Sequence, residues 1–109
     1  MSHRLFFFNK VADGVSVEEA EQFLRSEDLP LGRSLGSFTD YTLTRLEGTI
    51  EEPKPLPCEF IDIADVTSLD DYKDEISRLE SESEDWARFV AKFDKHFSAT
   101  TALYGTQVK

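Results

Sequence analysis

His3-Arg-Leu-Phe-Phe-Phe-Asn-Lys10 is the stretch that decides the fold, because this apolar and aromatic run has the composition and length of a β-strand. Asp13-Gly14 then predicts a turn. Ser16, with Glu19 three residues later, forms a capping box that begins a helix continuing to Leu24. The chain therefore opens with a strand, a turn and a capped helix.

The rest of the chain divides by the same criteria. A loop is expected over 28–36, where proline and glycine gather. Alternating threonine and apolar residues predict strands over 37–46 and 98–108, and an apolar run predicts one over 58–64. Prolines between 48 and 57 exclude that segment from a sheet, so it connects two paired strands. Helical spacing of apolar residues predicts helices over 69–79 and 86–96.

This order, βαββαβ, is the split arrangement of ferredoxin-like α+β domains, with a four-stranded antiparallel sheet and helices on one face. Residues 1–109 are expected to form a single domain. Alternate positions of each strand leave the second sheet face in need of cover. Two such sheets packed face to face would provide that cover.

Charge and cysteine content narrow the function classes. The formal net charge of −10 disfavours nucleic acid and anionic membranes as partners. Cys58, the only cysteine, excludes an intrachain disulfide and fits the cytoplasm, and the apolar run 5–8 is too short for a signal-peptide core. His3 and His96 lack metal-ligand spacing, so no metal or cofactor is expected.

Several segments together resemble a known superfamily: His3 with the phenylalanine run, Val15-Ser-Val-Glu-Glu19 at the helix start, and Leu69-Asp-Asp-Tyr72 in the later helix. The chain resembles the dimeric α+β barrel superfamily, and within it the stress-responsive barrel and RedY-like groups. That resemblance implies a homodimer with a small apolar pocket in each subunit. The RedY-like group is associated with prodiginine-type pigment pathways, which implies a pyrrole- or polyketide-like ligand.

The resemblance also implies site residues. Plant olivetolic acid cyclase, a member of the superfamily, is similar in having a histidine at the place of His3 and a tyrosine at the place of Tyr72, and both would face the pocket. That cyclase has a second, catalytic histidine after the tyrosine. This chain instead reads Tyr72-Lys-Asp-Glu-Ile-Ser-Arg78, so the helix-borne general base is absent.

Each candidate residue has a structural alternative. Alternation places His3, Leu5 and Phe7 on one strand face, where His3 could exchange a proton at neutral pH or could simply meet solvent. Tyr72 could orient a ligand with its hydroxyl or serve as a core aromatic residue. The predicted pocket lining is Leu5, Phe7, Phe23 and Trp86.

We therefore expect a homodimeric protein of secondary metabolism that binds an apolar aromatic or heteroaromatic intermediate and assists its cyclisation or condensation. His3 would be the acid/base and Tyr72 the hydroxyl donor. A non-catalytic carrier or accessory subunit is the main alternative, and the missing second histidine favours it. An RNA-binding module on the same topology lacks the basic and aromatic run that it would need.

Overall fold

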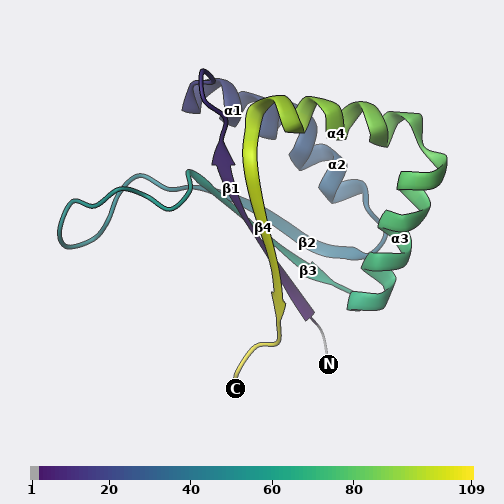
Figure 1. The fold of residues 1–109 in the computed structure, drawn as a ribbon. Helices are drawn as coiled ribbons and strands as arrows, with labels where there is room; N and C mark the ends of the chain where they lie inside the picture. Colours follow the sequence, from purple (N-terminus) through teal and green to yellow (C-terminus); the bar gives the residue numbers. More distant parts are fainter. Residues whose placement is uncertain (1–2) are drawn as a thin grey trace.

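The computed structural model describes residues 3–109. Its elements follow in the order β1 (His3–Val11), α1 (Val17–Phe23), the π-helix η1 (Leu24–Asp28), α2 (Leu29–Ser34), β2 (Phe38–Arg45), β3 (Phe60–Val66), α3 (Leu69–Glu82), α4 (Glu84–His96) and β4 (Phe97–Gly105). The expected α+β, ferredoxin-like order of strands and helical units is confirmed (Figure 1).

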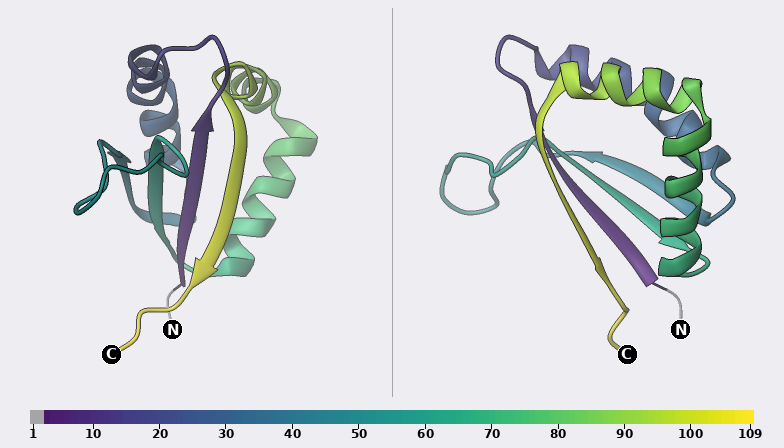
Figure 2. Two further views of the ribbon diagram at one scale, coloured as in Figure 1. Left: turned by 60° about the vertical axis from the view of Figure 1, so that its left-hand side comes forward. Right: turned by 45° about the vertical axis from the view of Figure 1, so that its right-hand side comes forward.

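The sheet has four strands in the order β2-β3-β1-β4, and all neighbouring pairs are antiparallel. Leu5 pairs with Ala64 on one side and with Tyr104 on the other. All helices lie against one face of this sheet, as the two side views in Figure 2 show. No helix of the described residues covers the opposite face (Figure 2), in agreement with the strand alternation.

Serine side chains cap α1, α3 and α4, and the cap at Ser16 is the one that its capping box predicts. Ser16 Oγ accepts a hydrogen bond from the Glu19 N–H at 3.1 Å, and Ser68 Oγ accepts one from the Asp71 N–H at 2.9 Å. These bonds satisfy N–H groups that have no partner within the helix. A third serine, Ser83, caps α4 in the same way, which separates α3 from α4.

The loop prediction over 28–36 is wrong, because most of this segment is helical: η1 continues α1 and passes into α2. Pro30 lies in the first turn of α2, directly after the π-helix η1. Gly32 lies directly against the ring of Tyr41, and a Cβ there would collide with that ring. Close packing on the sheet therefore outweighs the low helix propensity of these residues.

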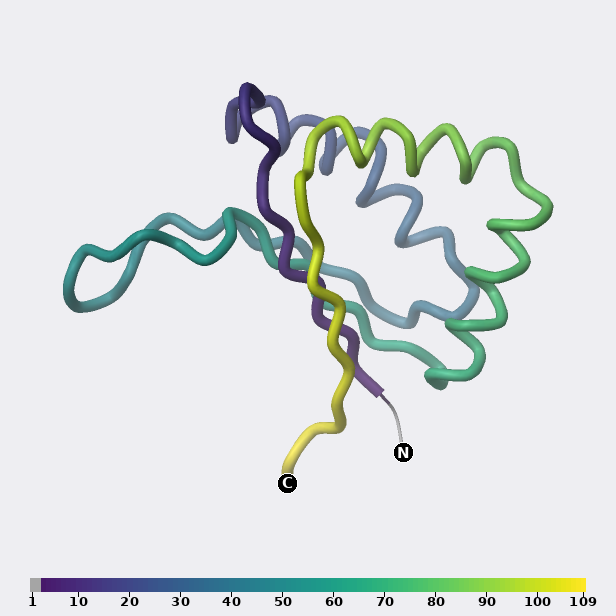
Figure 3. Tube along the Cα trace, viewed as in Figure 1, coloured from purple at the N-terminus to yellow at the C-terminus, as the bar shows by residue number. Residues whose placement is uncertain are grey.

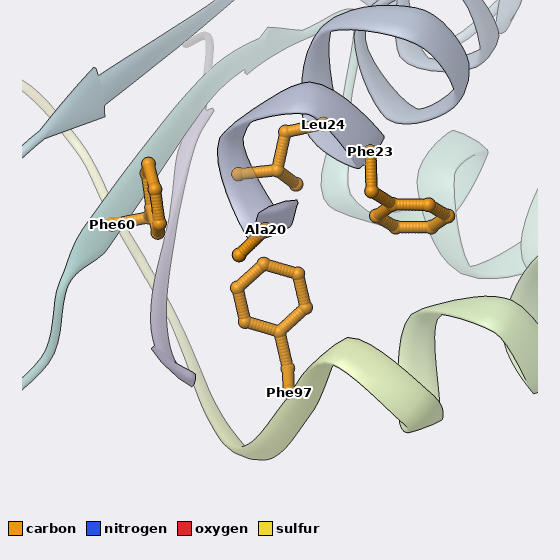
Figure 4. Packing of buried hydrophobic residues seen from close by; sticks show 5 residues of the cluster. All are labelled: Ala20, Phe23, Leu24, Phe60 and Phe97. Carbon is orange, nitrogen blue, oxygen red and sulfur yellow. The ribbon is translucent and has the colours of Figure 1, made fainter. Parts of the chain in front are cut away.

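Two apolar clusters join the layers. One holds Ala20, Phe23, Leu24, Phe60 and Phe97, whose side chains converge from the first helical unit, β3 and the junction of α4 with β4 (Figure 4). The other holds Leu5, Tyr41, Ala64 and Val66, with Tyr72 packed against it. Together these clusters fix α1 and α2 on the sheet.

Helices α3 and α4 cover the sheet less closely, since neither contains a buried residue although both are amphipathic. The segment between β2 and β3 extends away from the sheet (Figure 3). Within residues 3–109, no helix has the length and apolar content needed to cross a membrane.

Candidate functional site

A cavity of about 370 Å³ lies between the sheet and the helical layer. On the helical side its apolar wall comes from α2, α3 and α4, and α4 supplies the most residues. The lining residues are Phe7, Asn9, Asp28, Leu31, Gly32, Leu35, Phe38, Tyr41, Asp62, Tyr72, Ile76, Trp86, Phe89, Val90, Phe93, Asp94, Phe97, Ser98, Ala99 and Thr100. The size suits a small organic molecule.

Phe7, Tyr72 and Trp86 line this cavity, although they come from β1, α3 and α4. The Tyr72 ring stacks on Phe38 with 5.8 Å between the ring centroids and lies 6.4 Å from Phe7. Burial, with a smaller effect of the Asp62 charge, raises the pKa of Tyr72. Its hydroxyl therefore stays protonated and can donate a hydrogen bond.

His3, Leu5 and Phe23 lie outside the lining. Leu5 is buried behind the cavity in the cluster that Tyr72 packs against, and Phe23 is buried in the other cluster, stacked on His96 with ring centroids 4.4 Å apart. His3 meets Tyr104 edge to face at 5.8 Å, and its Nδ1 is buried with no hydrogen-bond partner among residues 3–109. The structure thus separates His3 from the cavity that Tyr72 lines.

A buried polar cluster on the cavity floor was missed by the sequence analysis. Asp28 ends η1, Tyr41 lies on β2 and Asp62 lies on β3. The Tyr41 hydroxyl oxygen lies 2.8 Å from Asp62 Oδ2 and is also hydrogen-bonded to Asp28 Oδ2. Asn9 donates its side-chain N–H to Asp62 Oδ1, and Thr100 donates to Asn9 Oδ1 at 2.6 Å.

The surroundings shift the acidity of both carboxyls. Burial raises the pKa of Asp28 to about 6, although the hydrogen bond from Tyr41 lowers it. Burial also raises the pKa of Asp62 to about 7, and the charge of Asp28 contributes to that rise. Burial and the two neighbouring carboxyls raise the pKa of Tyr41, so its hydroxyl keeps its proton. The raised pKa values bring the two carboxyls, but not Tyr41, into the range where a general acid or base works best.

One signal in the sequence could have revealed Asp62. Asp62 lies on the same face of β3 as Phe60, Ala64 and Val66, which are all buried under the helices. A carboxyl at such a position needs partners or a proton. By contrast, no local pattern connects it with Asp28 and Tyr41, which come from other elements.

The cavity is suited to neutral or cationic molecules. No lysine, arginine or histidine is among its lining residues, whereas three aspartates are. Across residues 3–109, no group of three histidine, cysteine, aspartate or glutamate side chains could hold a metal ion. The lining side chains offer apolar contact, hydrogen bonding and proton transfer.

Comparison with known proteins gives one family. The model of the family described as REDY-like protein HapK matches residues 3–108. No curated protein sequence matches the chain significantly.

Solved structures share the fold at low sequence identity. The chain is similar to HapK from Hahella chejuensis, with a TM-score of 0.73 and 14% identity over 97% of this chain and 92% of that one. It is similar to a dimeric ferredoxin-like protein of unknown function from Thermobifida fusca, with a TM-score of 0.69 and 15% identity over 98% and 92%. It is also similar to a hydroxynitrile lyase from Passiflora edulis, with a TM-score of 0.70 and 13% identity over 95% and 91%.

Proposed function

The chain belongs to the family of REDY-like protein HapK, and on that premise we propose that it binds an apolar aromatic or heteroaromatic intermediate of small-molecule biosynthesis in the cavity and assists its cyclisation or condensation. The observation that carries this proposal is the partly exposed apolar face of α4. Its apolar side chains Trp86, Phe89, Val90 and Phe93 line the cavity, and none of them is buried. An apolar helix face beside open space is a binding surface rather than a packed core.

The wall composition supports a neutral, flat ligand. Phe7, Phe38 and Tyr72 form one group of aromatic rings. Trp86 and Phe89 of α4 form a second pair, with 5.7 Å between the ring centroids. Such surfaces favour stacked or edge-on contact with another ring. An anionic ligand would meet aspartates and no cation, so we infer that carboxylate-bearing ligands are disfavoured.

We assign ligand contact to Phe7, Tyr72 and Trp86. Tyr72 would donate its hydroxyl hydrogen to a carbonyl or phenol oxygen of the ligand. Leu5 and Phe23 would hold the walls in place from behind, since both are buried in the supporting clusters. His3 can act as an acid or base only on a ligand that extends beyond the cavity lining, because it lies beside Tyr104.

A non-catalytic carrier is the second candidate function. The composition of α3 favours this function. The helix contains no histidine, and its contribution to the cavity wall is Tyr72 and Ile76, so it offers no imidazole to a ligand. A carrier would bind the intermediate stoichiometrically and release it unchanged. An enzyme would convert it over many turnovers.

We further propose that the protein is a homodimer. The uncovered sheet face carries Phe6, Phe8, Ile61 and Ile63, all half-buried, and Leu103, which is 53% exposed. A second copy of this face would remove these side chains from water, at about 25 cal/mol per Å² of apolar surface. The Thermobifida fusca protein of the same fold is described as dimeric.

Calorimetric titration with 2-naphthol, a neutral aromatic bicycle, tests the binding proposal. Val90→Glu places a charge in the lining, and Ala91→Glu places the same charge on the adjacent, exposed position of α4. We expect the first variant to weaken binding by about tenfold or more and the second to leave it unchanged. Equal affinities for both variants, or equally strong binding of 2-naphthoate, would contradict the proposal.

A further inference from the structure

The floor of the cavity holds a hydrogen-bond arrangement that binding alone does not require. Asp28 and Asp62 are 8% and 5% exposed, and a single hydroxyl, that of Tyr41, lies between them. Within residues 3–109 no lysine or arginine pairs with either carboxyl. Two buried carboxyls without a cation are costly if both are ionised.

Counting protons shows how the arrangement is satisfied. A phenol hydroxyl has one hydrogen, so it can donate to only one of its two carboxyl neighbours. The second contact needs a hydrogen from the carboxyl itself. The cluster of Asp28, Tyr41 and Asp62 is therefore complete when one carboxyl is protonated and the other is ionised.

The contacts of each carboxyl indicate which one has an oxygen atom free to meet a ligand. Both oxygens of Asp62 are engaged, Oδ1 by Asn9 and Oδ2 by Tyr41. Asp28 is engaged only through Oδ2, and its Oδ1 has no hydrogen-bond partner among the described residues. With Asp62 protonated, its O–H donates to Tyr41, and Tyr41 donates to an ionised Asp28. In that arrangement Asp28 is a carboxylate whose Oδ1 is free to accept a proton.

The geometry points to Asp28 as the general base of the cavity, exchanging a proton with a bound aromatic ligand through its free Oδ1, while Tyr41 and Asp62 position and stabilise its carboxylate; this inference rests on the proposed binding function. All three side chains line the cavity. Asp28 is thus the catalytic residue of the inference, and Tyr41 and Asp62 are positioning residues.

A neutral probe reaction isolates the proton transfer. In 5-nitrobenzisoxazole, Asp28 Oδ1 would remove the proton on C3. The C–H electron pair becomes the third bond of a nitrile as the ring N–O bond breaks, and the oxygen leaves as a phenolate that absorbs visible light. The protonated Asp28 then returns its proton to water. This reaction needs no other reactant, and a positioned base contributes about 100-fold or more to its rate.

Two measurements test the inference. Carbon-13 NMR of the aspartate carboxyls in the unaltered protein should show two that titrate near pH 6 and 7 rather than near the ordinary value of 3.8. Asp28→Asn should lower the rate of probe cleavage by about 100-fold, whereas Asp74→Asn, the same change on an exposed residue of α3, should leave it unchanged. The hydrogen bond from Tyr41 stabilises ionised Asp28, so its removal in Tyr41→Phe should raise the pKa of Asp28 and move the pH–rate profile to higher pH by about one unit.

The outcomes separate the two proposals. Equal cleavage rates for the unaltered protein and Asp28→Asn, with the probe bound by both, would overturn the inference and leave the binding function intact. Failure of the unaltered protein to bind either the probe or 2-naphthol would count against the binding function. In that case the carboxyl titration still decides, since two ordinary aspartate titrations would overturn the shared proton without any variant.

Discussion

Replacing Asp62 by asparagine should change how the stability of the protein depends on pH. In the folded protein, burial and the charge of Asp28 raise the pKa of Asp62 from 3.8 to about 7. In the unfolded chain the same carboxyl has its ordinary pKa. Between these two values the folded state holds a proton that the unfolded state has lost, so the free energy of unfolding falls as pH rises.

The size of the effect follows from the shift. One bound proton of difference gives a slope of about 1.4 kcal/mol per pH unit. From about pH 5 to about pH 7 the unaltered protein should therefore lose about 2–3 kcal/mol, and the loss is complete once pH exceeds the folded pKa. The shift of Asp28 is not added, because the two carboxyls share one proton through Tyr41.

Asp62→Asn mimics the protonated carboxyl. The amide oxygen can accept from Asn9, and the amide nitrogen can donate to Tyr41, which then donates to Asp28. We expect stability equal to that of the unaltered protein near pH 5 and greater by about 2 kcal/mol near pH 8. Urea unfolding followed by Trp86 fluorescence, at one protein concentration, measures both. A pH slope that is absent from the unaltered protein, or that persists in Asp62→Asn, would refute the reasoning; Asp74→Asn should keep the slope.

Three further variants test other parts of the structure. Gly32→Ala should push the Tyr41 ring away from the carboxyls and cost about 1–3 kcal/mol in urea unfolding; unchanged stability would contradict this contact. The carboxylate of Glu75 accepts hydrogen bonds from the N–H groups of Gly36 and Ser37 at 2.9 Å. Glu75→Gln removes its charge and should lower the free energy of unfolding by about 1 kcal/mol at neutral pH. Because these bonds lower the pKa of Glu75, the difference should shrink as acid protonates it. Leu103→Lys should halve the mass seen by light scattering if the open sheet face forms the dimer.

The fold was predictable where a local pattern repeats along one element. Alternation along β1 placed Leu5 and Phe7 on one strand face, because a strand turns successive side chains to opposite sides, and the structure shows that the helices cover this face. The serine caps at Ser16 and Ser68 were predictable for a similar reason, since donor and acceptor lie three residues apart. Both patterns are complete within a few residues.

The helical segment of η1 and α2 was not predictable in this way. Pro30 and Gly32 are typical of loops, and a local reading assigns them to one. Their helical state depends on the ring of Tyr41, which lies on β2 and occupies the space where a larger residue at 32 would project. The reason for the glycine is thus a contact between two elements, which residue types in sequence order do not contain.

The candidate site shows the same limit more strongly. Tyr72 and Phe7 were identified as pocket residues from resemblance and alternation, and they line the cavity. Asp28, Tyr41 and Asp62 were not identified, although strand period alone would place Asp62 among the buried residues of β3. The Tyr41 hydroxyl comes from β2 and the Asp28 carboxyl from η1, and only the folded chain brings them together with Asp62.

This cluster also explains why the cavity floor is polar in an otherwise apolar layer. A valine or leucine at position 62 would continue the buried pattern of Phe60, Ala64 and Val66 without a need for partners. The chain instead places a carboxyl there, with Asn9 and Tyr41 to satisfy it, and its raised pKa predicts a loss of stability as pH rises to neutral. A cost of that kind, next to an open aromatic cavity, is expected where stability is exchanged for chemistry. The asparagine variant measures that exchange directly: if it is more stable at pH 8, the carboxyl is retained for a reason other than folding.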